Sequence, residues 1–216
     1  MVIRQQEDDE GTLPLTTVEE MELVGGNVCL DFVNTGSNRK GGKVRDKLVI
    51  YGDLVTWAER VGEIGPETAA RLRDLAEADP AAADQVLRRA RELREAIYRS
   101  FSAIARGETA PAADLAILGE GVARASAHRL LVPTAEGCEY EYSDADALDR
   151  PLWPIALAAA ELATSKEVAR VKECASESCN WLFLDVSKNR SRRWCDMKDC
   201  GNRAKARRFR QRTKTG

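Results

Sequence analysis

The chain has a single histidine, His128, among its 216 residues, and it lacks the short motifs that mark common catalytic sites. It contains no Gly-x-Ser-x-Gly nucleophile elbow and no glycine-rich dinucleotide fingerprint. The glycine-rich segment Ser37–Lys43 lacks the Lys-Ser/Thr ending of a P-loop, so a surface loop explains it better than a phosphate site. We therefore do not expect an enzyme.

Long apolar runs are also missing. The longest nearly apolar segment, residues 151–162, is too short to span a bilayer, and residues 1–10 lack the apolar part of a secretion signal. With 44% apolar residues the chain can still bury a core. We expect a soluble cytoplasmic protein with no membrane partner, in which six cysteines bind metal more readily than they form disulfides.

Excess positive charge is absent from most of the chain and concentrated at its end. Residues 166–216 hold 15 Lys and Arg against 6 Asp and Glu, whereas residues 1–165 hold 18 against 29. The overall charge of −2 is therefore the sum of +9 over residues 166–216 and −11 over residues 1–165. A polyanion such as nucleic acid suits the basic part.

Four of the six cysteines form two evenly spaced pairs, Cys174 with Cys179 and Cys195 with Cys200. Four thiolates can close a tetrahedral shell around Zn²⁺ and leave no open position for a substrate. We predict a structural zinc site that supplies folding free energy to a segment too short to fold alone. The other two cysteines, Cys29 and Cys138, are expected to be small buried residues.

The remainder of the chain predicts helices. Asn27 is placed to cap a short helix over 28–33, apolar spacing predicts a helix over 53–60, and a further helix over 154–164 is expected. Prolines near their starts predict helices from 66, 80 and 111. In the helix over 80–106 apolar residues recur every three or four positions, which indicates a buried core stripe or a dimer seam. Residues 128–142 favour a β-hairpin.

These elements predict a mainly α fold with a small β-hairpin (α+β). We divide the chain into a loose arm over 1–20, a helical regulatory domain over 21–166 and a zinc finger over 167–216. The finger is expected to be treble-clef-like, with strands over 168–172 and 180–186 and a basic helix from Cys200. Trp181 or Phe183 is expected to pack over the zinc.

Basic side chains gather around the second cysteine pair and beyond it. A helix from Cys200 would carry two cationic faces, one suited to the major groove and one to phosphates. We therefore predict duplex DNA as the partner. The candidate contact residues are Lys188, Arg190, Arg192, Arg193, Arg203, Lys205, Arg207, Arg208, Arg210 and Arg212.

Three segments resemble the CGNR zinc finger family: Cys174-x4-Cys179-Trp-Leu-Phe-Leu-Asp185, Asn189-Arg-Ser-Arg-Arg-Trp-Cys195 and Cys200-Gly-Asn-Arg203. Residues 25–35, Gly-Gly-Asn-Val-Cys-Leu-Asp-Phe-Val-Asn-Thr, resemble the start of the ABATE domain, which commonly precedes this finger in stress-induced bacterial transcription regulators. The resemblance implies DNA binding by the finger and a regulatory, ligand-sensing front domain.

Several alternatives stay open at this point. Asp31, Asn34, Arg45 and Trp57 are candidates to line an effector pocket, although helix caps and packing explain them about as well. A homodimer would suit paired half-sites. Exposed Trp181, Trp194 and Phe209 could instead stack on unpaired RNA bases. A zinc-thiolate redox switch or protein-interaction adaptor is the third alternative.

Overall fold

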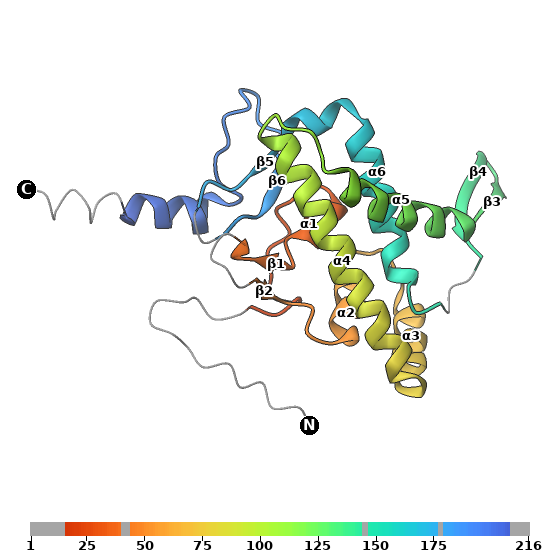
Figure 1. Cartoon of the computed structure of the whole chain (residues 1–216). Coiled ribbons are helices and arrows are strands. Elements are labelled where there is room, and N and C mark those ends of the chain that lie inside the picture. Colours follow the sequence, from red (N-terminus) through yellow and green to blue (C-terminus); the bar gives the residue numbers. More distant parts are fainter. Residues whose placement is uncertain (1–15, 40–43, 144–146, 177–178, 208–216) are drawn as a thin grey trace, which may run out of the picture.

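The fold is taken from a computed structural model that describes residues 16–39, 44–143, 147–176 and 179–207. Most of this part is helical, as the sequence predicted, and the strands form three separate antiparallel pairs, two of which the sequence predicted. Figure 1 shows the helices packed together, with the β5–β6 pair and the last helical segment at one end and the β3–β4 hairpin at the other. No helix in the described ranges is long and apolar enough to cross a membrane.

The helices begin close to where the sequence placed them. Asn27 caps the first through a 3.0 Å hydrogen bond from the Cys29 amide, and Asp79 caps the fourth in the same way. The second begins at Tyr51 rather than Asp53, because the Asp53 carboxylate accepts from the amides of the two residues that precede the helix. The helices are α1 (Val28–Val33), α2 (Tyr51–Arg60), α3 (Pro66–Ala78), α4 (Pro80–Ala105), α5 (Ala112–Ala127) and α6 (Trp153–Thr164).

Each strand pair is short. β1 (Gly36–Ser37) pairs with β2 (Arg45–Asp46), β3 (Arg129–Thr134) with β4 (Gly137–Tyr142), and β5 (Val171–Glu173) with β6 (Leu182–Leu184). The expectation of a strand from residue 168 was wrong. The 3-10 helix η3 (Lys166–Arg170) lies there, because the Ser165 hydroxyl caps it by accepting from the Glu167 amide.

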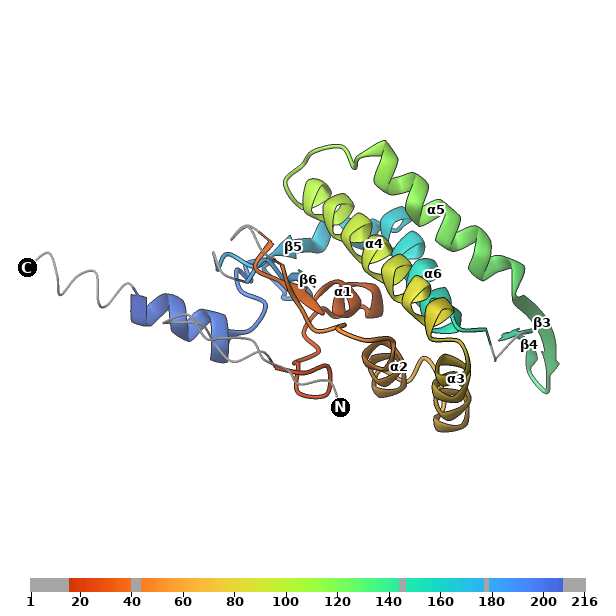
Figure 2. The same cartoon turned by 60° about the horizontal axis from the view of Figure 1, so that its bottom comes forward.

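The apolar stripe of α4 lies in the core of the chain. Val86, Ala90, Leu93, Ile97 and Phe101 are all at most 5% exposed and belong to one cluster with residues of the other helices. Figure 2 shows α4 running between α5 and α2, with α6 behind. Of the two interpretations of this stripe, the core is therefore confirmed, and these side chains are not available as a dimer seam.

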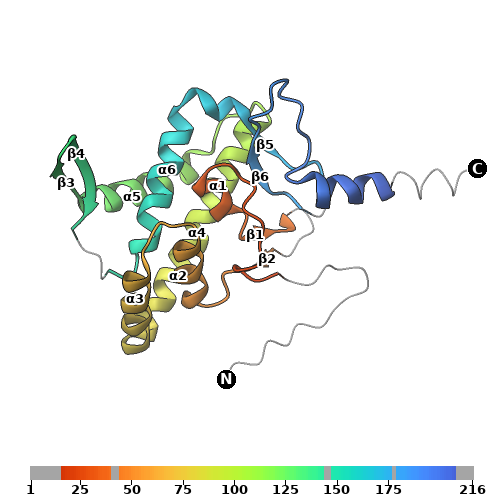
Figure 3. The ribbon, with the colours of Figure 1, turned by 180° about the vertical axis from the view of Figure 1, so that it is seen from behind.

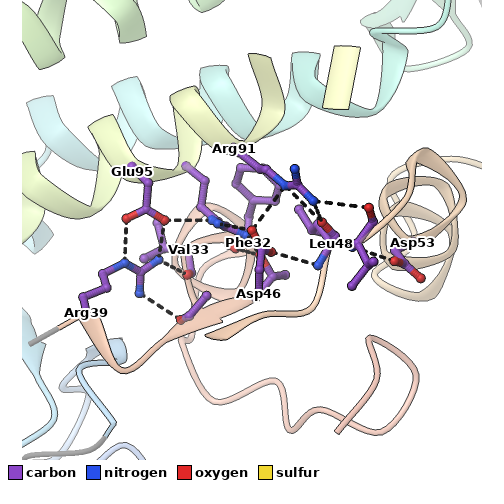
Figure 4. Close-up of polar contacts among 12 residues, drawn as sticks. Phe32, Val33, Arg39, Asp46, Leu48, Asp53, Arg91 and Glu95 are labelled. Atoms are coloured by element: carbon purple, nitrogen blue, oxygen red, sulfur yellow. Dashed lines mark hydrogen bonds and ion pairs between the residues drawn. The ribbon is translucent and has the colours of Figure 1, made fainter. Parts of the chain in front are cut away.

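Two arginine–carboxylate pairs connect the β1–β2 pair and the residues after β1 to α4 (Figure 4). Arg94 of α4 is 2% exposed and donates to both carboxylate oxygens of Asp46, at 2.6 and 2.8 Å. Arg39 donates to Glu95 of α4 and to the Val33 carbonyl at the end of α1. Desolvation by burial acts to raise the pKa of Asp46, but hydrogen bonding and charge from Arg94 outweigh it, and the pKa is lowered.

Strand β6 packs directly against the helical part of the chain. The side-chain amide of Asn34 donates to the Leu182 carbonyl and accepts from the Leu182 amide, both at 2.9 Å. Two residues further along the strand, the Leu184 amide donates to the Gly25 carbonyl at 2.8 Å. Figure 3 shows α1 lying between β6 and the helices α4 and α6, with which it packs.

The side chains of β6 alternate between two clusters. Leu182 and Leu184 belong to the helical core, whereas Phe183 packs among four buried cysteines. This alternation is the two-residue period of a strand, which places successive side chains on opposite faces. One three-residue strand therefore contributes to both hydrophobic clusters.

Replacing Asn34 by leucine tests this junction. Asn34 has no exposed surface, so the change would leave the amide and carbonyl of Leu182 buried without partners. We expect the free energy of unfolding, measured in urea by circular dichroism, to fall by about 2–5 kcal/mol. Asn189→Leu, at an exposed position, is the control and should change it by less than about 0.5 kcal/mol. Equal effects of the two substitutions would contradict the role of Asn34.

Candidate zinc centre and nucleic-acid interface

The four cysteines of the two pairs converge on one point. Their sulfur atoms all lie within 4.8 Å of one another, and all four side chains are buried. Cys174 follows β5, and Cys179 precedes β6. Cys195 follows the loop after β6, and Cys200 lies in the π-helical turn η4 (Met197–Gly201), which Asp196 caps. Residues 202–207 continue from this turn as a helix.

The spacing of the sulfurs fits zinc. A tetrahedral Zn²⁺ site with Zn–S bonds of about 2.3 Å has an S···S edge of about 3.8 Å. The Cys179 and Cys195 sulfurs are 3.6 Å apart, and those of Cys195 and Cys200 are 3.7 Å apart. These distances are far longer than a disulfide bond, which is about 2.05 Å. The donor set and its geometry therefore suit a closed, structural Zn²⁺ site.

The close approach of the four sulfurs changes the pKa values of their thiols. Hydrogen bonds from Cys179 and the other two thiols lower the pKa of Cys174 well below that of a free thiol. The same bond to Cys174 raises the pKa of Cys179. Four thiols held this close therefore cannot ionise independently. A dication that replaces their protons stabilises all four thiolates at once.

Two cations face the sulfur cluster from different parts of the chain. Arg203 donates from Nη2 to the Cys200 sulfur at 3.1 Å and to Asp199 at 2.8 Å. Lys47, which follows β2, is only 9% exposed, and its Nζ lies 5.8 Å from the ring centre of Trp181. Desolvation and then the charge of Arg45 lower the pKa of Lys47, while the Cys179 thiolate opposes that change. Both cations offset the net charge of −2 that four thiolates and Zn²⁺ carry.

A carboxylate and an arginine order the loop between the cysteine pairs. Asp185 has no exposed surface and accepts from the Ser187 amide, the Lys172 ammonium and the Arg192 amide. Desolvation acts to raise its pKa, but these hydrogen bonds lower it overall. Arg192 donates to the carbonyls of Trp194 and Cys195, and its guanidinium lies 4.4 Å above the Phe183 ring.

The predicted nucleic-acid residues fall into two groups. Arg192 and Arg203 make the internal contacts described above and are partly buried. Lys188, Arg190, Arg193, Lys205 and Arg207 are exposed, in the loop before Cys195 and on the helix after Cys200. Arg208, Arg210 and Arg212, like Phe209, lie outside the described residues. Contact of any of them with nucleic acid stays a prediction.

The four candidate effector residues lie in four different surroundings. Asn34 is bonded to Leu182, and Arg45 lies on β2. Trp57 is fully buried against Phe32. Asp31 accepts from the Gly25 amide at 2.8 Å, and burial raises its pKa to about 6. Caps and packing, the alternative raised from the sequence, therefore describe Asp31 and Asn34, whereas the buried indole Nε1 of Trp57 makes no hydrogen bond within the described part of the chain. The effector role of all four stays a prediction.

The two cysteines outside the cluster differ from each other. Cys29 is buried on α1, as expected, and desolvation by burial raises the pKa of its thiol. Cys138 lies exposed on β4, so the expectation that it is buried was wrong. The reason is that the β3–β4 hairpin projects from the body of helices and both of its strands are largely exposed (Figure 1).

The fold and the site define a helical domain joined to a four-cysteine zinc finger. Comparison with known families agrees with this class. Residues 26–166 match the ABATE family, described as "putative stress-induced transcription regulator", and residues 170–213 match the CGNR zinc finger. The chain belongs to the ABATE family, carries a CGNR zinc finger, and has Zn²⁺ as its cofactor. Among curated proteins no relative matches.

Sequence reasoning missed Lys47 and Asp185 as residues of this site. Nothing near Lys47 in the sequence connects it to cysteines more than 120 residues away. Asp185 offered a weak signal, because a carboxylate directly after an apolar strand and before a Ser-Lys-Asn turn often accepts local backbone hydrogen bonds.

The contact between Arg203 and Cys200 predicts that Arg203 strengthens zinc binding. Arg203→Met should weaken zinc affinity about 10- to 100-fold, because hydrogen-bonded neighbours of metal ligands typically contribute that much. The measurement is competition for zinc with a chromogenic chelator. Lys205→Met removes the same charge from an exposed position two residues away and should leave the affinity unchanged. Equal affinities for the two variants would exclude this role of Arg203.

Proposed function

We propose that this chain is a transcriptional regulator whose finger, residues 167–216, binds duplex DNA under the control of the helical domain, residues 21–166. The observation that supports DNA binding is the division among the basic residues of the finger. Arg192 and Arg203 stabilise the zinc centre, and this leaves Lys188, Arg190, Arg193, Lys198 and Lys205 at the surface on both sides of the second cysteine pair. Exposed cations on a rigid, metal-bound frame suit a phosphate backbone.

The helix over 202–207 is well placed for this role. Figure 1 shows it extending away from the body of helices, so that its sides are accessible to a large partner. It follows directly from Cys200, and the zinc centre therefore fixes its starting direction. The major groove of B-DNA is wide enough to admit an α-helix presented in this way.

Two observations weigh against the alternatives. Trp181 and Trp194 pack partly buried against the four cysteines, whereas stacking on unpaired RNA bases needs exposed rings. The four sulfurs are buried, with at most 7% of each cysteine exposed, whereas redox-sensing cysteines are accessible to solvent. Duplex DNA is therefore the partner we propose.

Control by the helical domain is supported by the shared strand β6. A change in α1 acts directly on Leu182 and Leu184 through the Asn34 and Gly25 hydrogen bonds. A change in α4 reaches β5 through a 2.7 Å hydrogen bond from Ser102 to Glu173. We propose that an effector bound to the helices alters DNA affinity by these two routes.

Salt dependence tests DNA binding by the zinc-loaded protein. If six to eight phosphates are contacted, log affinity should fall against log salt with a slope of about −5 to −7, measured by fluorescence anisotropy. Replacing Arg193 or Lys205 by methionine should weaken binding and make the slope shallower by about 1 each.

Arg71→Met is the matched control for these variants, because it removes one exposed arginine from α3, away from the finger. It should leave the slope unchanged. A slope near zero, no DNA binding with zinc present, or stronger binding to single-stranded RNA would each contradict the proposal.

A further inference from the structure

A small cavity lies between α4 and α5, closed at one end by the 3-10 helix η2 (Arg150–Leu152) and Trp153. Its volume is about 100 Å³, smaller than a cavity of about 150 Å³ that binds benzene, so it has room for roughly four or five heavy atoms. Leu93, Ile117 and Leu152 give it apolar walls, and Arg89 and Arg124 bring guanidinium groups. None of the four effector candidates from the sequence lines it.

Two residues that line this cavity each have a buried hydrogen-bond donor with no acceptor among the described residues. Trp153 is 1% exposed, and its indole Nε1 makes no hydrogen bond. The Nε of Arg89 is buried and has none either. Buried N–H groups in native proteins are nearly always bonded to protein, water or a ligand. A bound ligand or water that reaches these two N–H groups would supply the acceptors that the protein does not.

Of the three carboxylates that line the cavity, Asp149 forms ion pairs with Arg89 and Arg124 but accepts no hydrogen bond from either. The closest approach of Asp149 is 4.0 Å to Arg89 Nη1 and 3.7 Å to Arg124 Nε, both too long for a hydrogen bond. The Asp149 carboxylate therefore lies between the two guanidiniums without accepting a hydrogen bond from their N–H groups. Glu92 and Glu120 also line the cavity, but as exposed residues they stay hydrated.

We propose that this cavity binds a small carboxylate with an apolar body. The carboxylate oxygens accept from the indole N–H of Trp153 and from the Arg89 guanidinium, and the apolar part packs on Leu93, Ile117 and Leu152. A neutral amide of the same shape provides one acceptor and loses the charge. A cationic amine provides no acceptor and leaves both buried donors unpaired.

Helix α4 connects this cavity to the finger. From Arg89 to Ser102 the helix rises about 20 Å. Between them Arg94 and Glu95 bind the β1–β2 pair, and the Asn38 amide beside β1 donates to the Cys179 carbonyl at 3.3 Å. This inference rests on the proposed regulatory function and adds to it a binding site and a chemical class for the effector. Binding to the cavity is nevertheless measured without DNA, so either proposal can fail alone.

Titration of the zinc-loaded full chain with propionate and with the smaller acetate, followed by ¹H–¹⁵N NMR, tests the site. The indole N–H signal of Trp153, assigned by its loss in Trp153→Phe, should shift on titration with at least one of the two acids. Propionamide should bind at least about tenfold more weakly than propionate, and propylamine should not shift the signal.

Variants of the lining residues separate this site from nonspecific binding. Arg89→Met should weaken the binding of the acid at least about tenfold. Trp153→Phe should also weaken it, while keeping a ring to stack on His128, whose ring centre lies 4.2 Å away. Arg88→Met, which removes the exposed neighbouring arginine of α4, is the control and should bind as the wild type does.

Three outcomes would overturn the proposal. The first is that neither acid shifts the Trp153 signal, which would mean that water alone fills the cavity. The second is that propylamine binds as well as propionate. The third is that Arg89→Met, shown to be folded by its spectrum, binds the acids with unchanged affinity. If Trp153→Phe fails to fold, the comparison of Arg89→Met with Arg88→Met still decides the question.

Discussion

The structure depends on strand β6, which is a component of two hydrophobic clusters at once. Phe183 packs among the zinc-binding cysteines, while Leu182 and Leu184 pack with the helices. The backbone of the same strand bonds to Asn34 and to Gly25. Because the strand has only three residues, neither cluster can lose it without disturbing the other. We therefore expect the metal centre and the helical domain to behave as one folding unit, in spite of their opposite charges.

This arrangement gives the basic residues of the finger different tasks. A zinc ion with four thiolates is an anion inside the protein, and Arg203 and Lys47 lie where they offset its charge. Arg192 fixes the path of the loop by binding backbone carbonyls. Lys188, Arg190, Arg193, Lys198 and Lys205 lie at the surface, where we propose that a phosphate backbone contacts them. A count of positive charge alone does not distinguish these tasks, because they are set by the position of each guanidinium relative to the sulfurs.

Much of the fold followed from local sequence signals. Asn27, Asp79 and the prolines placed the helix starts, and the cysteine spacing indicated the metal site, because caps and metal spacings act over a few residues. The junction between the parts depends on contacts across the whole chain. Asn34 and Leu182 are 148 residues apart, and no local pattern links them. The cavity that we propose as a binding site has the same origin, because it combines residues of α4, α5 and η2 that have no common motif. The effector role of Asp31, Asn34, Arg45 and Trp57 stays a prediction.

The central claim is that zinc at the four cysteines and the folding of the helical domain are coupled through β6. Amide hydrogen exchange, measured residue by residue on the zinc-loaded protein and after removal of zinc by a chelator, tests it directly. The account predicts that zinc removal lowers the protection of Leu182 and Leu184 and also of the α1 amides of Asp31, Phe32 and Val33, while the exposed β3–β4 hairpin changes little. Loss of protection confined to residues beyond 170, with α1 unchanged, would contradict it.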